Sequence, residues 1–149
     1  MSTDTIYLNT ILQHYRDPRN RGTLEPCDGK ARGHNPNCGD DLMVYLRTRE
    51  ERLSEIRFEG KGCAISLSSA SMMTEAVTGK SRDEVMAIAR AFRRLMQDGV
   101  ATEGKGVEPA ALGELAVMEG IRRYEARIKC ALLAWNALEE ALAGSEGDR

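Results

Sequence analysis

Residues 35–40, Asn-Pro-Asn-Cys-Gly-Asp, hold a thiol and a carboxylate two positions apart across a glycine. Pro36 fixes its own φ angle and biases Asn35 toward extended conformations, while the glycine lets the chain turn sharply after Cys38. The stretch therefore predicts a short rigid loop that directs Cys38 and Asp40 at one target. Such a pair can begin a metal or thiolate site, although a surface turn with a half-buried cysteine would read the same way.

A second thiol, Cys63, follows the residues Gly-Lys-Gly at 60–62 and opens an apolar, serine-rich run that predicts a helix reaching about Val77. Unpaired amide groups and the positive end of the helix dipole stabilise a thiolate at the start of a helix. The small residues of this run also suit close packing against a sheet. Its serines are assigned no chemistry.

A third thiol, Cys130, falls in the first turn of the last expected helix, which starts near residues 125–129 and carries an apolar face from Ile128 to Leu142. Three thiols and Asp40, delivered by separate segments, would complete a tetrahedral Zn²⁺ site with metal–sulfur distances of roughly 2.3 Å. Soft thiolates also suit iron-sulfur chemistry. The spacings match no short zinc motif, so spacing alone is weak support.

The composition limits what these residues belong to. A chain of 149 residues that is 42% hydrophobic and 30% charged suits one globular domain, expected over residues 1–143, with a disordered polar tail at 144–149. The 21 Lys+Arg and 23 Asp+Glu are mixed along the chain and give a formal charge of −2, which favours neither nucleic acid nor a membrane as partner.

The N-terminus has no signal pattern, and no charge-free stretch is long enough to span a bilayer, so we expect a cytoplasmic protein. The 4 cysteines form no CxxC pair. In a reducing compartment they indicate metal-binding, catalytic or buried thiols.

The elements that must position the thiols predict an α+β fold, with helices packed on a small antiparallel three-stranded sheet. Residues 42–47 and 53–59 alternate in polarity and are joined at residues 50–52, and a short extended piece at 31–34 supplies a further strand. The loop at 35–40 then lies at one end of this sheet.

Further helices follow from apolar residues at helical spacing. A first helix is expected to bury apolar residues between Tyr7 and Tyr15, and a later one, opened by a capping box at residues 81–84, to bury those from Val85 to Met96. Residues 97–106 read as a polar connection, after which Pro109 begins a short helix.

Four stretches in order resemble one known family across nearly the whole chain. They are HYRDPRNRG at 14–22, NPNCGD at 35–40, GKGCAIS at 60–66 and RIKCALLAW at 127–135. Together they resemble the U-type iron-sulfur cluster assembly family, which comprises the SufU, IscU and NifU N-terminal-domain proteins.

Two details make the chain more similar to the SufU branch. The long segment through residues 97–108 resembles the extra stretch of SufU proteins. Lys129 stands before Cys130 where the IscU branch carries a histidine, and no LPPVK-like sequence precedes it. The resemblance therefore argues against docking to the dedicated Hsp70 chaperone pair.

The resemblance implies that Cys38, Asp40, Cys63 and Cys130 hold Zn²⁺ and that the partner is a PLP-dependent cysteine desulfurase of the SufS type. It suggests that a partner histidine takes the place of Cys38 on the metal, so that the freed thiolate accepts persulfide sulfur for a downstream Suf-type scaffold or for apoproteins. The chain would then act as a sulfurtransferase-like acceptor and desulfurase activator rather than as a stand-alone enzyme. Arg127, about one turn before Cys130, either steadies the thiolates, pairs with Asp40 or is solvated.

Two other function classes remain open. A scaffold would build a [2Fe-2S] or [4Fe-4S] cluster on the same cysteines before transferring it to apoproteins. A thiol hydrolase or peroxidase would use Cys63 at its helix start, but no motif supplies a histidine base. Cys27 is interpreted as structural or incidental, and His14 and His34 as packing or surface residues.

Overall fold

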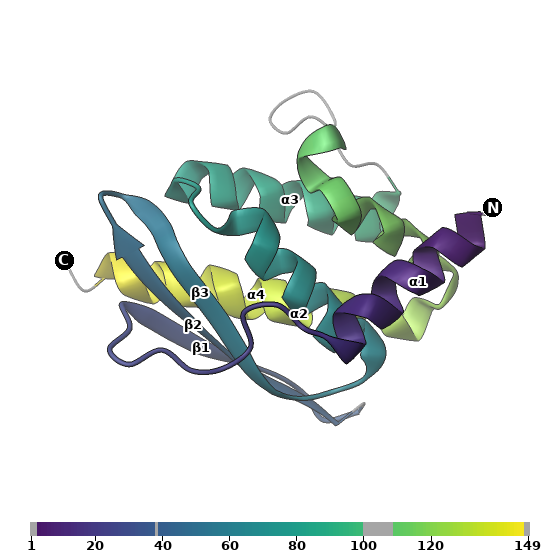
Figure 1. Ribbon diagram of the computed structural model, residues 1–149, viewed down its shortest axis with the longest axis horizontal. Coiled ribbons are helices and arrows are strands. Elements are labelled where there is room, and N and C mark those ends of the chain that lie inside the picture. The colour runs from purple at the N-terminus through teal and green to yellow at the C-terminus, as the bar shows by residue number, and fades with distance from the viewer. Residues whose placement is uncertain (1–2, 38, 100–108, 148–149) are drawn as a thin grey trace.

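The computed structural model describes residues 3–37, 39–99 and 109–147 (Figure 1). The chain order of its elements is α1 (Thr3–Arg16), β1 (Gly29–Asn35), β2 (Asp40–Arg49), β3 (Arg52–Lys61), α2 (Ala64–Val77), α3 (Arg82–Asp98), the 3₁₀ helix η1 (Pro109–Arg123) and α4 (Glu125–Gly147). Within those ranges, no helix has the length and apolar character needed to cross a membrane.

The three strands form one antiparallel sheet in the order β1-β2-β3, which confirms the α+β fold expected from the sequence. Between β2 and β3 the chain turns at Glu50 and Glu51, which have φ angles of 54° and 65°. Positive φ at both central residues is the conformation of the type I′ turn, whose twist matches that of a tight hairpin. Arg52, expected in the connection, is already the first residue of β3.

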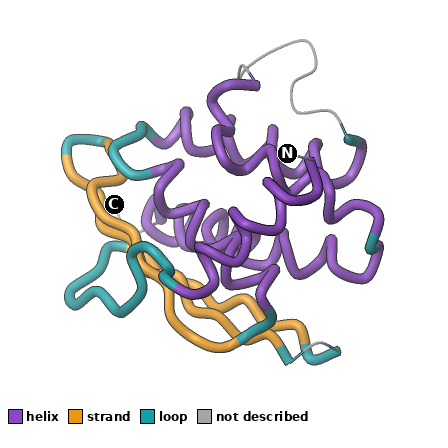
Figure 2. The backbone as a smooth tube through the Cα atoms, turned by 45° about the vertical axis from the view of Figure 1, so that its right-hand side comes forward, coloured by secondary structure: helices purple, strands orange, loops and turns teal. Residues whose placement is uncertain are grey.

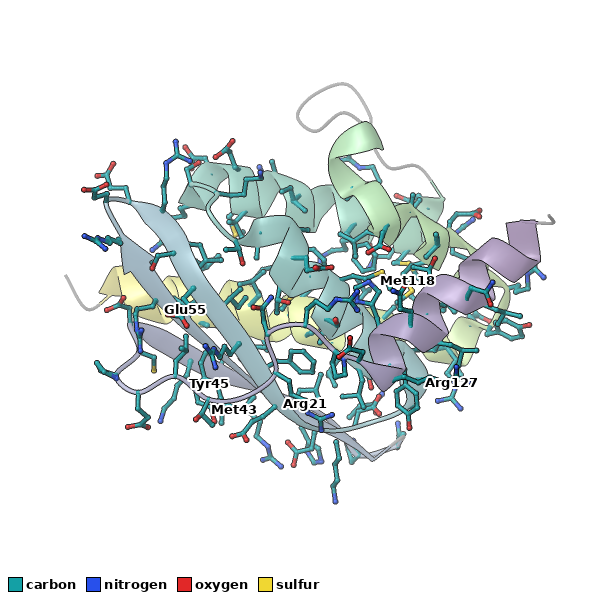
Figure 3. All side chains as sticks on the ribbon, in the orientation of Figure 1. Arg21, Met43, Tyr45, Glu55, Met118 and Arg127 are labelled. Carbon is teal, nitrogen blue, oxygen red and sulfur yellow. The ribbon has the colours of Figure 1, made fainter. Side chains whose placement is uncertain are left out.

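The helices cover one face of this sheet, as Figures 1 and 2 show from two directions. The even-numbered residues of β2 from Asp40 to Leu46 are fully buried under the helices. Met43, Tyr45 and Glu55, labelled in Figure 3, project from the opposite face. From Asp40 to Leu46 the alternation is strict, so the parity of a residue assigns it to one face; the register shifts after Arg47.

Helix α4 runs along the buried face and is covered on nearly all sides. It packs against β1 and β2 on one side and against α2 and α3 on the other. The indole of Trp135 stacks on Phe92 with ring centroids 4.8 Å apart, and its Nε1–H donates to Ser69 Oγ at 3.2 Å. The helix continues to Gly147, so residues 144–147, which were expected to form part of a disordered tail, are helical. Residues 148–149 lie outside the described ranges.

Helix α1 differs most from its sequence pattern. Of the apolar residues expected to face inward, Ile11 is buried, but Leu8, Leu12 and Tyr15 keep 52%, 37% and 43% of their surface exposed. In the last turn of the helix, the buried position is taken by His14 instead. Spacing identified the helix correctly, but among the described residues α1 packs mainly against α2 and η1, which leaves Leu8, Leu12 and Tyr15 partly exposed.

Helix α3 and the segment after it agree with the sequence in outline. The capping box at Ser81 and Glu84 is present, and α3 extends through Asp98 to a left-handed Gly99, two residues past the expected start of the connection. Residues 100–108, which carry most of that connection, are outside the described part of the chain. From Pro109 the chain forms 3₁₀ helix interrupted by a kink at Gly113, and its buried residues recur every third position, the repeat that this helix type stacks on one side. They are Leu112, Leu115, Met118 and Ile121.

Replacing Phe92 by alanine should lower the free energy of unfolding by about 3–5 kcal/mol, because the ring is fully buried against Trp135 and its loss leaves a cavity. Urea denaturation followed by circular dichroism measures the change. Leu8→Ala, on the exposed face of α1, is the control and should change stability by no more than about 0.5 kcal/mol. Equal effects of the two substitutions would contradict the packing described here.

Candidate metal centre

Asp40 begins β2, and the parity of that strand directs its side chain into the protein. The side chain is fully buried, in line with Leu42 and Val44. The next residue, Asp41, points the other way and accepts two hydrogen bonds of 2.7 Å from the guanidinium of Arg32 on β1. These hydrogen bonds hold the pKa of Asp41 below its usual value. Two adjacent acids thus have different roles, one in a surface ion pair and one at an internal site.

The buried carboxylate of Asp40 uses only one of its two oxygens within the protein. Oδ1 accepts a hydrogen bond of 2.9 Å from the backbone N–H of Cys63. Oδ2 is also buried and has no hydrogen-bond partner among the described residues. An ionised oxygen in that situation loses its hydration without compensation, so burial is favourable only when another positive or hydrogen-bonding group faces it.

Two thiols lie close to this carboxylate. Cys63 is the N-cap residue of α2, as the sequence predicted, and Cys130 is fully buried. Because α4 begins at Glu125, Cys130 lies in its second turn and not in the first, where it had been expected. The ligand atoms of Asp40, Cys63 and Cys130 all lie within 4.8 Å of one another, so three segments distant in sequence meet at one point.

Cys38, the fourth expected ligand, lies outside the described residues. Its neighbours are described: Asn35 and Asp40 pair across β1 and β2, and the N–H of Gly39 donates to the carbonyl of Asn35 at 2.9 Å. Gly39 has a φ angle of 75°, the left-handed conformation that glycine adopts without strain. The sequence correctly predicted a short turn at the end of the sheet.

Arg127 lies one turn before Cys130, at the start of α4, on the side of the molecule where α1 is found (Figure 3). Its Nη1 is 3.9 Å from the sulfur of Cys130. A guanidinium at this distance supplies positive charge next to the thiol. Among the described residues, Cys27 and His34, which were not expected to be ligands, do not join this group.

Gly62 is a functional residue that sequence reasoning did not single out. A Cβ atom at this position would collide with Ser66 Oγ and would stand 2.8 Å from Asp40 Oδ1. Glycine therefore lets the β3–α2 connection pass directly over the carboxylate. The glycine within GKGC was a visible signal, but it was interpreted only as the end of a strand.

The donors present fit a thiophilic metal ion. Two sulfurs and a carboxylate oxygen are the ligand types of zinc, and the unpartnered Oδ2 of Asp40 is the atom that a cation would satisfy. Such a set leaves a coordination position open for one further ligand. The same thiols suit iron-sulfur chemistry, so the donor set defines a metal centre without selecting the metal.

The chain belongs to the family described as the NifU-like N terminal domain, whose model matches residues 6–131. Among its relatives, the zinc-dependent sulfurtransferase SufU of Bacillus subtilis is 37% identical over 145 residues, which span 97% of this chain and 94% of that protein. The iron-sulfur cluster assembly scaffold protein IscU of Streptococcus pyogenes is also 37% identical, over 143 residues, 94% of this chain and 84% of that protein.

Solved structures agree with the sequence relatives. The crystal structure of a nitrogen-fixing NifU-like protein (N-terminal) from Brucella abortus matches with a TM-score of 0.84 and 28% identity, over 99% of this chain and 100% of that one. The family suggested by the four sequence motifs is therefore confirmed by sequence and by fold.

Asp40→Asn should weaken zinc binding by about tenfold or more, because the amide keeps the bond from Cys63 but presents an N–H₂ group where the free oxygen stood. Competition with a chromophoric chelator measures the affinity. The matched control is Asp41→Asn, whose side chain points to the opposite face and should leave zinc affinity unchanged. Equal affinities in all three proteins would exclude Asp40 as a ligand.

Gly62→Ala should also weaken zinc binding, since the added methyl displaces the Asp40 carboxylate or Ser66, and should destabilise the metal-free protein by about 1–3 kcal/mol. Chelator competition and urea denaturation report the two effects. Gly144→Ala is the control, because a Cβ there meets no atom within 4 Å. An alanine variant with unaltered affinity would mean that the carboxylate has room to shift without cost.

Proposed function

We propose that this protein is a zinc-dependent sulfurtransferase in iron-sulfur cluster assembly, with Cys38 as the residue that accepts sulfur. The observation that carries the proposal is the buried carboxylate of Asp40, which has one unpartnered oxygen and lies with the thiols of Cys63 and Cys130 in one group whose ligand atoms are within 4.8 Å of one another. The likeness to the Bacillus subtilis zinc-dependent sulfurtransferase supports it, since the match spans nearly both chains.

Asp40, Cys63 and Cys130 would hold the metal together with Cys38. When bound, Zn²⁺ keeps its cysteine ligands as thiolates. Covalent geometry supports the fourth ligand, because two residues of chain separate Cys38 from Asp40 by no more than about 7 Å between Cα atoms. Of the three described donors, Asp40 begins β2, Cys63 is the N-cap residue of α2 and Cys130 lies in α4, whereas Cys38 stands in the sequence between β1 and β2.

Sulfur transfer would proceed by thiol exchange at Cys38. Its thiolate attacks the outer sulfur of a cysteine persulfide, a new sulfur–sulfur bond forms to Cys38, and the bond within the persulfide breaks. The donor cysteine leaves as a thiolate with the bonding electron pair, so no external oxidant or reductant is consumed. The positive charge of Arg127, beside Cys130, would stabilise the thiolates of Cys63 and Cys130 electrostatically.

The persulfide donor would be a cysteine desulfurase of the SufS type, and the sulfur would pass on to a Suf-type scaffold or to apoproteins. Two features of the chain support the SufS type over an IscU-like pathway: Lys129 before Cys130, and the long segment through residues 97–108. In this role the protein is a persulfide acceptor and desulfurase activator. A cytoplasmic location suits it, because free thiols persist in a reducing compartment.

A second candidate is a scaffold that assembles a [2Fe-2S] or [4Fe-4S] cluster on the same cysteines. It is favoured by the likeness to the Streptococcus pyogenes IscU scaffold and by the suitability of thiolates for iron. The two functions differ in cargo. Anaerobic purification followed by metal analysis separates them, since zinc alone supports sulfur transfer, whereas iron with sulfide supports the scaffold.

Cys38→Ser should abolish sulfur acceptance, because a hydroxyl cannot carry a persulfide. The zinc-loaded protein is incubated with a SufS-type desulfurase and L-cysteine, and mass spectrometry of the intact chain detects the added sulfur atom. Cys27→Ser, at a cysteine outside the metal cluster, should accept sulfur like the wild type. Persulfide on the Cys38→Ser protein, or no stimulation of the desulfurase by the wild type, would refute the proposal.

A further inference from the structure

A second group of metal-ligating side chains lies among the helices, apart from the thiols. His14 of α1, Glu75 of α2 and Glu114 of η1 have ligand atoms within 4.8 Å of one another. The imidazole Nε2 of His14 is 2.8 Å from Glu114 Oε1 and 3.9 Å from Glu75 Oε1. Three separate elements therefore converge on one ring nitrogen.

The imidazole is fixed from its other side. His14 is fully buried, and its Nδ1 is 2.7 Å from the hydroxyl oxygen of Ser71, which also accepts a hydrogen bond of 2.8 Å from the backbone N–H of Arg19. Histidines that bind metals are commonly held in this way, with the second ring nitrogen in a hydrogen bond that sets the orientation of the ring. The remaining nitrogen of His14 is thus aimed at the two carboxylates.

Hydrogen bonding alone accounts for only part of this arrangement. The Nε2 atom can donate one proton, which the 2.8 Å contact assigns to Glu114, yet Glu75 also turns Oε1 toward the same atom. Arg19 approaches the other oxygen of Glu75, with Nε 3.8 Å from Oε2, and leaves Oε1 facing His14. A divalent cation would neutralise the charge of the two carboxylates that meet at this nitrogen.

We propose that His14, Glu75 and Glu114 bind a first-row divalent metal ion, of the class of Zn²⁺ or Fe²⁺. An imidazole ligand favours these ions over Mg²⁺ and Ca²⁺. After a small shift of the exposed Glu75 side chain, the three donor atoms would fit metal–ligand bonds of about 2.1 Å. The side chains of Glu75 and Glu114 are 45% and 54% exposed, so the ion enters from solvent and completes its shell with water.

This ion is independent of the thiolate centre. Ser71, which holds the imidazole, lies about 12 Å further along α2 than Cys63, at 1.5 Å per residue. The donors also differ, since the first centre presents sulfur and the second nitrogen and oxygen. Binding would tie η1 to α1 and α2, because each of these elements contributes one ligand.

The test uses the full chain with zinc already bound at the cysteines and Co²⁺ as the probe. Equilibrium dialysis should find one further equivalent of Co²⁺, with ligand-field bands and no sulfur-to-cobalt charge-transfer band, and Co²⁺ should raise the melting temperature. A charge-transfer band with release of zinc would overturn the proposal, because the probe would then have entered the thiolate site. Absence of a further equivalent would overturn it as well.

Glu75→Gln and Glu114→Gln keep the shape of the exposed side chains and remove their charge, so each should weaken Co²⁺ binding at least tenfold and abolish the thermal shift. The control is Glu119→Gln, an exposed acid on the same 3₁₀ helix as Glu114, which should bind like the wild type. Retention of wild-type Co²⁺ affinity in either ligand variant would refute the assignment. Zinc content at the cysteines serves as the check that each variant is folded.

Discussion

The burial of the Asp40 carboxylate constrains the rest of this structure. An ionised oxygen withdrawn from water and left unpaired costs several kcal/mol, a large fraction of the net stability of a small domain. The sheet, α2 and α4 nevertheless hold it in place, with the N–H of Cys63 on one oxygen and the sulfurs of Cys63 and Cys130 near the carboxylate. A cation at this point would compensate the cost of burying the carboxylate, so folding and metal binding are expected to be thermodynamically coupled.

Much of this arrangement could be predicted from local sequence. The alternation of Leu42, Val44 and Leu46 assigns even positions of β2 to the core, and extending the same parity back to residue 40 places Asp40 inside and Asp41 outside. The glycines before Cys63 predicted its position at the start of α2. What local patterns could not supply is convergence, because nothing in a strand or helix pattern states that residues 40, 63 and 130 meet. The residue types suggested that the three thiols and Asp40 share one site, but their spacing supported this only weakly, and the family resemblance gave the expectation its main support.

The parts that sequence did not predict depend on tertiary neighbours. Helix α1 has a regular apolar pattern, but it is covered only along one strip, so Leu12 and Tyr15 stay exposed and His14 is buried. A histidine can occupy that position because Ser71 and Glu114 satisfy both of its nitrogens, and these partners lie far away in sequence. The serines of α2 were expected only to allow close packing. In the structure, Ser71 and Ser69 form hydrogen bonds with the buried side chains of His14 and Trp135.

The distribution of the ligands over the fold bears on how the thiolate centre can work. Asp40, Cys63 and Cys130 are anchored by a strand and two helices, so moving any of them would break ladder or helix hydrogen bonds and expose core. Cys38 instead stands in the sequence between β1 and β2, next to Gly39, whose N–H donates to the carbonyl of Asn35. With Cys38 as the proposed fourth ligand, a centre whose three other donors are anchored in this way would present a single thiolate to a partner while the rest of the site kept its geometry.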